Sequence, residues 1–133
     1  IHHALVLGDV NQLKKINDQY GHEIGDQLIV AVARALQKTL RITDIAARTG
    51  GDEFVVLLTN STEEEAGHFV ERLQEQVFSS LKLPLPDGTE FPVTVSLGKA
   101  GTDKHLPEAL TKEADRQMYA AKERFYAAMP RYR

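Results

Sequence analysis

The chain has 133 residues, with 16 Lys and Arg against 19 Asp and Glu, so its formal net charge is −3. This length fits one compact domain, and the absence of cysteine excludes a disulfide scaffold, a thiolate zinc site and a thiol nucleophile. The slight negative charge disfavours non-specific nucleic-acid binding, and no apolar run approaches the roughly 20 residues that span a bilayer. We therefore expect a cytoplasmic domain without direct membrane contact.

The N-terminal third predicts one strand and two helices. Ala4–Leu7 is a short apolar run, typical of a buried strand that ends at Gly8-Asp9. A short helix follows, with Asn11 as its expected cap and Gly21 just after its end. The next helix is longer, and its apolar residues recur at three- and four-residue steps: Ile24, Leu28, Val32, Ala35 and Leu36.

A hairpin is predicted next. Asp44–Arg48 and Phe54–Leu58 have the composition of strands, and Thr49–Asp52 between them contains the two glycines of a tight turn.

The C-terminal half predicts a helix, a second hairpin and a final helix. Ser61 or Thr62, with an acidic residue three positions later, forms a capping box that opens the first helix. The apolar face of that helix contains Ala66, Phe69, Val70, Leu73 and Val77. Pro84–Gly88 is the expected turn of the hairpin, Phe91–Gly98 its return strand, and Leu106–Ala128 the last helix. The order β-α-α-β-β-α-β-β-α indicates an α+β fold with helices packed on a largely antiparallel sheet.

Acidic residues in three parts of the chain are candidates for chemistry. Asp9 ends a strand, Asp26 lies in the long helix, and Asp52 and Glu53 lie in the hairpin. Two strand-end carboxylates that meet across a sheet would make a hard oxygen site for Mg²⁺ or Mn²⁺. Taken alone, each acid is more typical of a turn or cap residue. The turn from Asp9 to Lys14 also offers backbone N–H groups and an ammonium to phosphate oxygens.

Together, these motifs resemble the GGDEF family of diguanylate cyclases. The matching segments are Asp9–Asp18, Gly21-His22, Gly25-Asp26, Arg48–Phe54, Ala114-Asp115 and Met118–Lys122. The resemblance implies a single domain over residues 1–133, with a palm-like sheet similar to that of nucleotide cyclases. It implies condensation of two GTP into cyclic di-GMP across a homodimer, with release of two pyrophosphates.

The resemblance also implies roles for individual residues. The metal set, expected to hold two Mg²⁺ or Mn²⁺ ions once substrate is bound, contains Asp9, the Val10 carbonyl, Asp52 and Glu53. The substrate-binding set contains Asn17, His22, Asp26 and Lys122. Asp52 is implied as general base and Lys14 as the group that stabilises charge on the phosphates. Guanine presents two adjacent donors, which the acceptors Asn17 and Asp26 can match.

A product-inhibition site is implied by Arg41-Ile42-Thr43-Asp44, which matches the family's RxxD motif, with Arg72 as a further arginine. Guanidinium groups suit phosphates and guanine edges. The same spacing taken alone is common in surface ion pairs of small energetic effect.

Two departures from the family keep a second hypothesis open. The last helix continues as Glu123–Ala127, so a phosphate-contacting arginine of the family is replaced by Tyr126, unless Arg124 takes its place. The family's preceding Asp-x-Leu-Thr segment is not in this chain, which suggests the C-terminal part of a longer signalling protein with an upstream sensor or dimerisation domain. The alternative to an active cyclase is a catalytically weak or inactive module that binds GTP or cyclic di-GMP.

Overall fold

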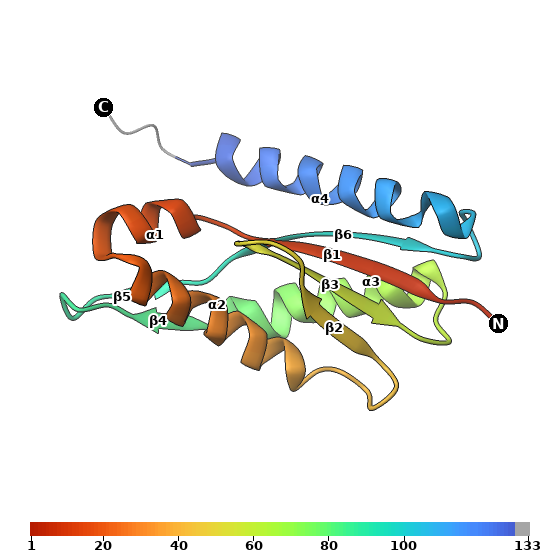
Figure 1. The fold of residues 1–133 in the computed structure, drawn as a ribbon, viewed down its shortest axis with the longest axis horizontal. Helices are drawn as coiled ribbons and strands as arrows, with labels where there is room; N and C mark the ends of the chain where they lie inside the picture. Colours follow the sequence, from red (N-terminus) through yellow and green to blue (C-terminus); the bar gives the residue numbers. More distant parts are fainter. Residues whose placement is uncertain (130–133) are drawn as a thin grey trace.

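A four-stranded antiparallel sheet forms the centre of the structure (Figure 1). The computed structural model describes residues 1–129. The sheet contains, in spatial order, β2 (Ile45–Arg48), β3 (Glu53–Leu58), β1 (Ala4–Val10) and β6 (Val95–Gly101). All three neighbouring pairs are antiparallel, so the predicted fold class is confirmed.

Helices cover both faces of the sheet. They are α1 (Leu13–Tyr20), α2 (His22–Gln37), α3 (Glu63–Arg72) and α4 (Leu110–Ala127). On one face, Val6 and Val56 of the central strands pack in the main core with apolar residues of α2 and α3, such as Leu28 and Phe69. Helix α4 packs across β6 and β1 (Figure 1). Among the described residues, no helix combines the length and the apolar character needed to cross a bilayer.

Helix α4 approaches the sheet closely at Gly98 of β6. A Cβ at this position would overlap the Ala114 carbonyl and the Met118 backbone nitrogen of α4. The missing side chain therefore sets the height of α4 above the sheet and, with it, the position of every side chain that α4 contributes to a site.

The predicted capping box is present at the start of α3. Thr62 accepts a hydrogen bond from the Glu65 N–H at 3.2 Å, and Glu65 accepts one from the Thr62 N–H at 3.0 Å. The expected continuous helix to Val77 is wrong in detail. The chain passes into a π-helical turn (Leu73–Val77) and then into a 3₁₀ turn (Phe78–Ser80), which keeps Leu73 and Phe78 buried.

The expected cap at Asn11 is wrong. Strand β1 continues to Val10, and Gln12 is the residue before α1. The Asn11 side chain is buried and bonds to β6 and the segment before it: its Oδ1 accepts from Ser96 at 2.9 Å and its Nδ2 donates to Thr94 at 3.3 Å. The bond from Ser96 occupies the side-chain oxygen that a cap would need as an acceptor.

The expected return strand Phe91–Gly98 is two strands. Strand β5 (Glu90–Pro92) pairs with β4 (Lys82–Pro84) in a separate two-stranded sheet, whereas β6 joins the central sheet. The two residues between β5 and β6 bridge these sheets, because the Val93 N–H bonds to Leu81 and the Thr94 carbonyl accepts from Asn11. The last helix begins with a 3₁₀ turn (Pro107–Ala109) but otherwise follows the predicted range.

Candidate active site

The acidic residues gather where β1 ends and the β2–β3 hairpin turns. Asp9 lies opposite Glu53 in the register of β1 and β3. The Val10 N–H donates a 2.8 Å hydrogen bond to the Asp52 carbonyl, which holds the hairpin against the end of β1. Antiparallel pairing thus brings Asp9, Asp52 and Glu53 to one place, as the sequence predicts for Asp9 and Asp52.

Asp9 is buried, whereas Asp52 and Glu53 are partly exposed. Asp9 is only 3% exposed, and its Oδ2 accepts a 2.9 Å hydrogen bond from the Lys122 ammonium of α4. Its other oxygen, Oδ1, is buried and has no hydrogen-bond partner in the described part of the chain. Burial raises the pKa of Asp9 to about 6; the negative charge of Asp52 acts in the same direction, and Lys122 opposes both. A buried oxygen without a partner is costly, so this position favours a cation.

The residues at this edge fit a divalent metal ion. Carboxylate and carbonyl oxygens are the donors that Mg²⁺ and Mn²⁺ prefer, and an ion at Asp9 would satisfy its orphaned oxygen. Within residues 1–129, no group of three or more His, Cys, Asp or Glu side chains is arranged to hold a metal. An ion at Asp9 and Asp52 would therefore complete its coordination with main-chain, substrate or water oxygens, and the role of Glu53 as a further ligand stays a prediction.

The start of α1 offers backbone donors next to these carboxylates. Gln12, the residue before the helix, has φ 67° and makes no side-chain capping bond. The first N–H groups of a helix lack partners within the helix and carry partial positive charge. Lys14 lies exposed in this first turn. The arrangement suits the phosphate groups that the sequence predicts here.

The glycine-rich turn leaves open space beside the carboxylates. A Cβ built on Gly51 meets no atom within 4 Å, and neither Gly50 nor Gly51 has a positive φ. Neither the backbone conformation nor packing inside the described chain therefore requires glycine at Gly51. The Arg48 guanidinium, which the sequence analysis did not single out, holds the turn by donating to the carbonyls of Gly50 and Gly51 at 3.0 and 2.6 Å.

The residues expected to bind guanine lie where α1 meets α2. The Asn17 side chain of α1 lies over Gly25 of α2, at a place that a Cβ on Gly25 would fill. Its Oδ1 is buried and without a hydrogen-bond partner in residues 1–129. Asp26 follows Gly25 directly, and His22 is the first residue of α2; both are exposed. The helix pair thus brings Asn17 close to Asp26, which a sequence spacing of nine does not by itself ensure.

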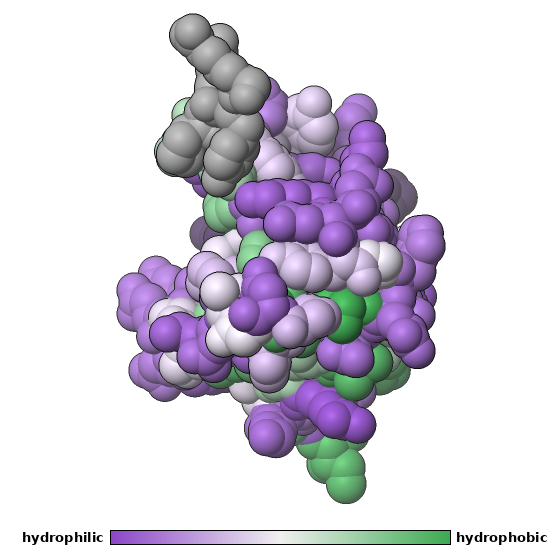
Figure 2. All heavy atoms as spheres, turned by 90° about the vertical axis from the view of Figure 1, so that its left-hand side faces the viewer, coloured by the Kyte–Doolittle hydropathy of each residue, from purple (hydrophilic) through white to green (hydrophobic). Residues whose placement is uncertain are grey.

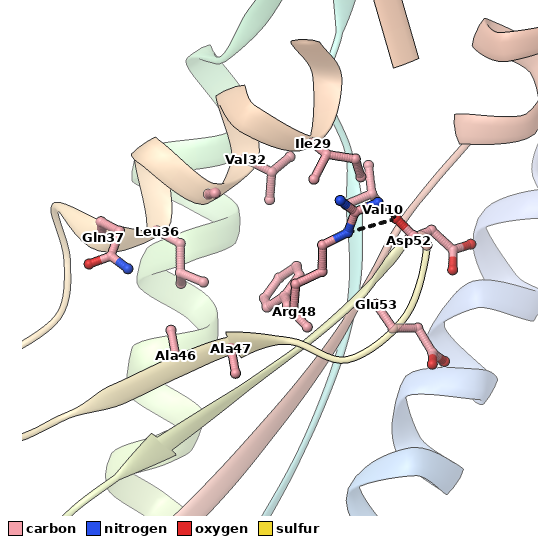
Figure 3. A pocket seen from close by; sticks show the side chains of 13 residues that line it. Val10, Ile29, Val32, Leu36, Gln37, Ala46, Ala47, Arg48, Asp52 and Glu53 are labelled. Atoms are coloured by element: carbon pink, nitrogen blue, oxygen red, sulfur yellow. Dashed lines mark hydrogen bonds between the residues drawn. The ribbon is translucent and has the colours of Figure 1, made fainter. Parts of the chain in front are cut away.

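A small apolar cavity of about 110 Å³ separates α2 from the hairpin. Figure 3 shows Ile29, Val32 and Leu36 of α2 on one side of it and Ala46 of β2 on the other, with Asp52 at one end. The sequence analysis placed Val32 and Leu36 on the apolar face of this helix, gave them no other role and did not single out Ile29 or Ala46. The periodicity of this helix predicts a buried face, and only the packing of α2 on the hairpin shows that the face leaves a cavity beside Asp52.

The three residues expected at the product site line a second cavity, of about 290 Å³. Arg41 and Asp44 form a 3.0 Å ion pair, and Arg72 lies on the wall with His68 and Glu65. Burial alone raises the pKa of Asp44, but the hydrogen bonds from Arg41 outweigh it and bring that pKa below its ordinary value. The structure therefore brings the predicted set together in one polar cavity.

Arg41 is also tied to the chain beyond Asp44. It donates to the Thr59 carbonyl at 2.6 Å and to the Ser61 hydroxyl at 2.9 Å. These bonds orient the guanidinium before any ligand arrives.

Tyr126 and Lys122 bring α4 to the same region. The Tyr126 hydroxyl accepts a 2.8 Å hydrogen bond from the Gln12 N–H. The sequence analysis noted Tyr126 only as the replacement of an arginine, and no local pattern signals a contact over 114 residues. The surrounding end of the molecule, which carries α1, is mostly hydrophilic (Figure 2), as expected for a site that binds polar ligands.

Comparisons with known proteins identify the family of this chain. The sequence model of the family described as "Diguanylate cyclase, GGDEF domain" matches residues 1–126. The uncharacterized protein YhcK of Bacillus subtilis is 43% identical over 122 residues, which cover 90% of this chain and 34% of that protein. The diguanylate cyclase DosC of Escherichia coli is 34% identical over 122 residues, covering 91% of this chain and 26% of DosC. The chain thus spans about a third or less of these curated relatives.

Solved structures show the same fold. The GGDEF domain of YfiN (also TpbB) from Pseudomonas aeruginosa has a TM-score of 0.78 and 33% identity over 92% of this chain and 77% of its own. The GGDEF domain of DgcB from Caulobacter crescentus, solved in complex with c-di-GMP, has a TM-score of 0.81 and 27% identity over 92% of this chain and 72% of its own.

Proposed function

The chain belongs to the GGDEF domain family of diguanylate cyclases, and we propose that it condenses two GTP molecules into cyclic di-GMP with release of two pyrophosphates. The observation that carries this proposal is the orphaned, buried oxygen of Asp9 beside Asp52 and the start of α1. Carboxylates can bind a divalent cation, and the backbone N–H groups at the start of α1 can bind phosphate oxygens. A nucleoside triphosphate with its metal requires both kinds of group side by side.

Asp9 and Asp52, with the Val10 carbonyl, would hold two divalent ions when substrate is bound. Such ions lower the pKa of a ribose hydroxyl and neutralise charge on the triphosphate. The backbone bond between Val10 and Asp52 supports this arrangement, because it holds the hairpin that carries Asp52 against the end of β1, which carries Asp9.

The phosphates would lie on the first turn of α1. The N–H groups there, together with the ammonium of Lys14, stabilise negative charge that grows on the phosphate oxygens. Lys122 reaches the same region from α4, since its ammonium already contacts Asp9.

Guanine would be recognised between α1 and α2. Asn17 presents a buried acceptor without a partner, and Asp26 a carboxylate. Both accept from the adjacent donors of guanine, whereas adenine would leave the carboxylate unpaired. His22 lies at the entrance to this helix pair as a further substrate contact.

In the reaction, the 3′-oxygen of one GTP forms a bond to the α-phosphorus of the other. The bond from that phosphorus to the β-phosphate bridging oxygen breaks, and pyrophosphate leaves with the electron pair. We assign the 3′-hydroxyl proton to Asp52. A second, symmetric step closes the ring. Each domain contributes one GTP, so a homodimer is required, and association could be driven by an upstream sensor domain of the same polypeptide.

The cavity around Arg41, Asp44 and Arg72 would bind cyclic di-GMP and reduce activity. Two guanidinium groups suit the phosphates and the guanine edges of the product, and Asp44 can accept from the base. The polar walls and the bonds that orient Arg41 support this assignment.

The test is incubation of the purified chain with GTP and Mg²⁺ at high protein concentration, followed by chromatographic separation of nucleotides. Appearance of cyclic di-GMP, with specific activity that rises with protein concentration, is the expected result. If no product forms, the domain is dimerised through a fused coiled coil and tested again.

A second candidate function rests on Tyr126. Because this residue stands where an arginine is expected and already contacts Gln12, the chain could be a module that binds GTP or cyclic di-GMP without turnover. Binding of either nucleotide by a forced dimer that yields no cyclic di-GMP would select this alternative over the cyclase.

A further inference from the structure

Two successive turns of α4 contact the end of β1 and the residue before α1. Lys122 contacts Asp9 at 2.9 Å, and Tyr126, four residues later on the same side of the helix, contacts Gln12 at 2.8 Å. Both contacts connect segments more than 110 residues apart in sequence. Helix α4 therefore contacts the chain just before and within the short connection from β1 to α1, next to the proposed phosphate position.

The contact at Gln12 involves a backbone donor directly before the first turn of α1, where the phosphates are proposed to bind. Gln12 has a left-handed φ of 67°, which few residues other than glycine adopt readily. Its N–H directly precedes the first turn of α1, which has no side-chain cap. This N–H and the N–H groups that follow can therefore bind one anion together. The Tyr126 hydroxyl oxygen accepts a hydrogen bond from the Gln12 N–H, as a phosphate oxygen would.

From this geometry, and on the basis of the proposed function, we propose that Tyr126 is an internal competitor for the phosphate position: its hydroxyl occupies the Gln12 N–H, and a nucleotide phosphate must displace it to bind. The displacement needs little rearrangement, because Tyr126 is 43% exposed and can turn into solvent. Its ring contacts Phe125 in an edge-on arrangement, at 5.1 Å between centroids, and a phenylalanine would keep that contact.

The competitor makes a clear prediction about affinity. If a ligand must break one neutral hydrogen bond of the free protein in order to bind, its affinity falls by about two- to tenfold. Tyr126→Phe removes the acceptor but keeps the ring, so nucleotide triphosphate should bind two- to tenfold more tightly. Tyr126→Leu also removes the acceptor and should shift the affinity in the same direction.

The experiment measures the Kd of 3′-deoxy-GTP with Mg²⁺ by calorimetry for wild type, Tyr126→Phe and Tyr126→Leu. This probe keeps the triphosphate but lacks the attacking hydroxyl, so turnover does not interfere. Tyr119→Phe is the matched control, because Tyr119 is the other tyrosine of α4 and is also exposed, at 60%. Its Kd should equal that of wild type.

Hydrogen exchange of the Gln12 amide, followed by NMR without nucleotide, tests the contact separately. Protection in wild type and its loss in Tyr126→Phe is expected. Unchanged or weaker nucleotide binding by Tyr126→Phe would overturn the competitor, and so would an unprotected Gln12 amide in wild type. Failure of wild type and both variants to bind the probe, with Gln12 protected, would refute the proposed GTP site instead.

Discussion

Lys122 and Asp9 are 113 residues apart in the chain, yet the lysine ammonium lies 2.9 Å from the aspartate carboxylate. This pair satisfies one oxygen of Asp9 and leaves the other buried without a partner in the described residues. Lys122 thus provides part of the positive charge that the acidic edge needs, and the remaining oxygen stays available to a metal ion.

Replacing Lys122 should destabilise the folded chain, because Asp9 then lacks its partner. In Lys122→Met, Asp9 loses its hydrogen-bonding cation, so the free energy of unfolding at pH 7 should fall by about 1–3 kcal/mol in urea titrations with EDTA. Asp9→Asn added to Lys122→Met should recover most of the loss, and millimolar Mg²⁺ should stabilise Lys122→Met more than wild type. Lys112→Met, at an exposed position of the same helix, is the control and should change stability by less than about 0.5 kcal/mol. An equal loss in both single variants would contradict the pairing.

The raised pKa of Asp9 predicts a pH dependence of stability in metal-free protein. The folded chain holds the Asp9 proton up to about pH 6, whereas the ordinary pKa is 3.8. The folded state binds the Asp9 proton more tightly than the unfolded state does. The resulting increase in the free energy of unfolding is therefore fully present below pH 3.8 and is lost as the pH rises through 6. Relative to Asp9→Asn, wild type should lose up to about 3 kcal/mol of unfolding free energy between pH 4 and 7. Parallel pH profiles of the two proteins would show that the Asp9 pKa is ordinary.

Asp52→Ala should separate chemistry from product binding. The variant lacks a proposed metal ligand and base, so cyclic di-GMP synthesis should fall below detection. Asp52 does not line the cavity around Arg41, so cyclic di-GMP should still bind there with nearly the wild-type Kd. Wild-type turnover by this variant would refute the assignment of Asp52, and loss of both properties would indicate a folding defect, which circular dichroism detects.

Arg41→Ala should weaken product binding and also destabilise the fold. The substitution removes bonds to Asp44, Thr59 and Ser61, so we expect at least a tenfold higher Kd for cyclic di-GMP and a stability loss of about 1–3 kcal/mol. Arg116→Ala is the matched control, because Arg116 forms the same three-residue spacing with Glu113 but is 70% exposed. Its stability should change by less than about 0.5 kcal/mol. Product affinity equal to wild type in Arg41→Ala would place that site elsewhere.

Gly98→Ala should disturb the site from a distance. The added Cβ would overlap the backbone of α4 at Ala114 and Met118, so α4 must shift and the fold should lose about 1–3 kcal/mol. Gly51→Ala, which meets no atom within 4 Å, should keep wild-type stability to within about 0.5 kcal/mol. Thermal unfolding compares the two, and equal midpoints would contradict the close packing of α4 on β6.

The sequence by itself determined what depends on neighbours a few residues apart. The Thr62–Glu65 capping box, the hairpin around Gly50 and Gly51, and the apolar stripe of α2 were predicted correctly, because each arises from contacts within about four positions. The family resemblance placed Asp9 and Asp52 together, and the antiparallel register confirms that proximity.

Only the tertiary structure decided which polar groups are satisfied and by whom. Asparagine is a residue type that often caps helices, but the Asn11 side chain bonds to Ser96 and Thr94. Gln12 takes the position before α1 instead. The pairing of Lys122 with Asp9 and of Tyr126 with Gln12 depends on the height of α4 above β6, which Gly98 sets. Such contacts join segments whose separation along the chain carries no local signal, because the packing of helix on sheet fixes their distance.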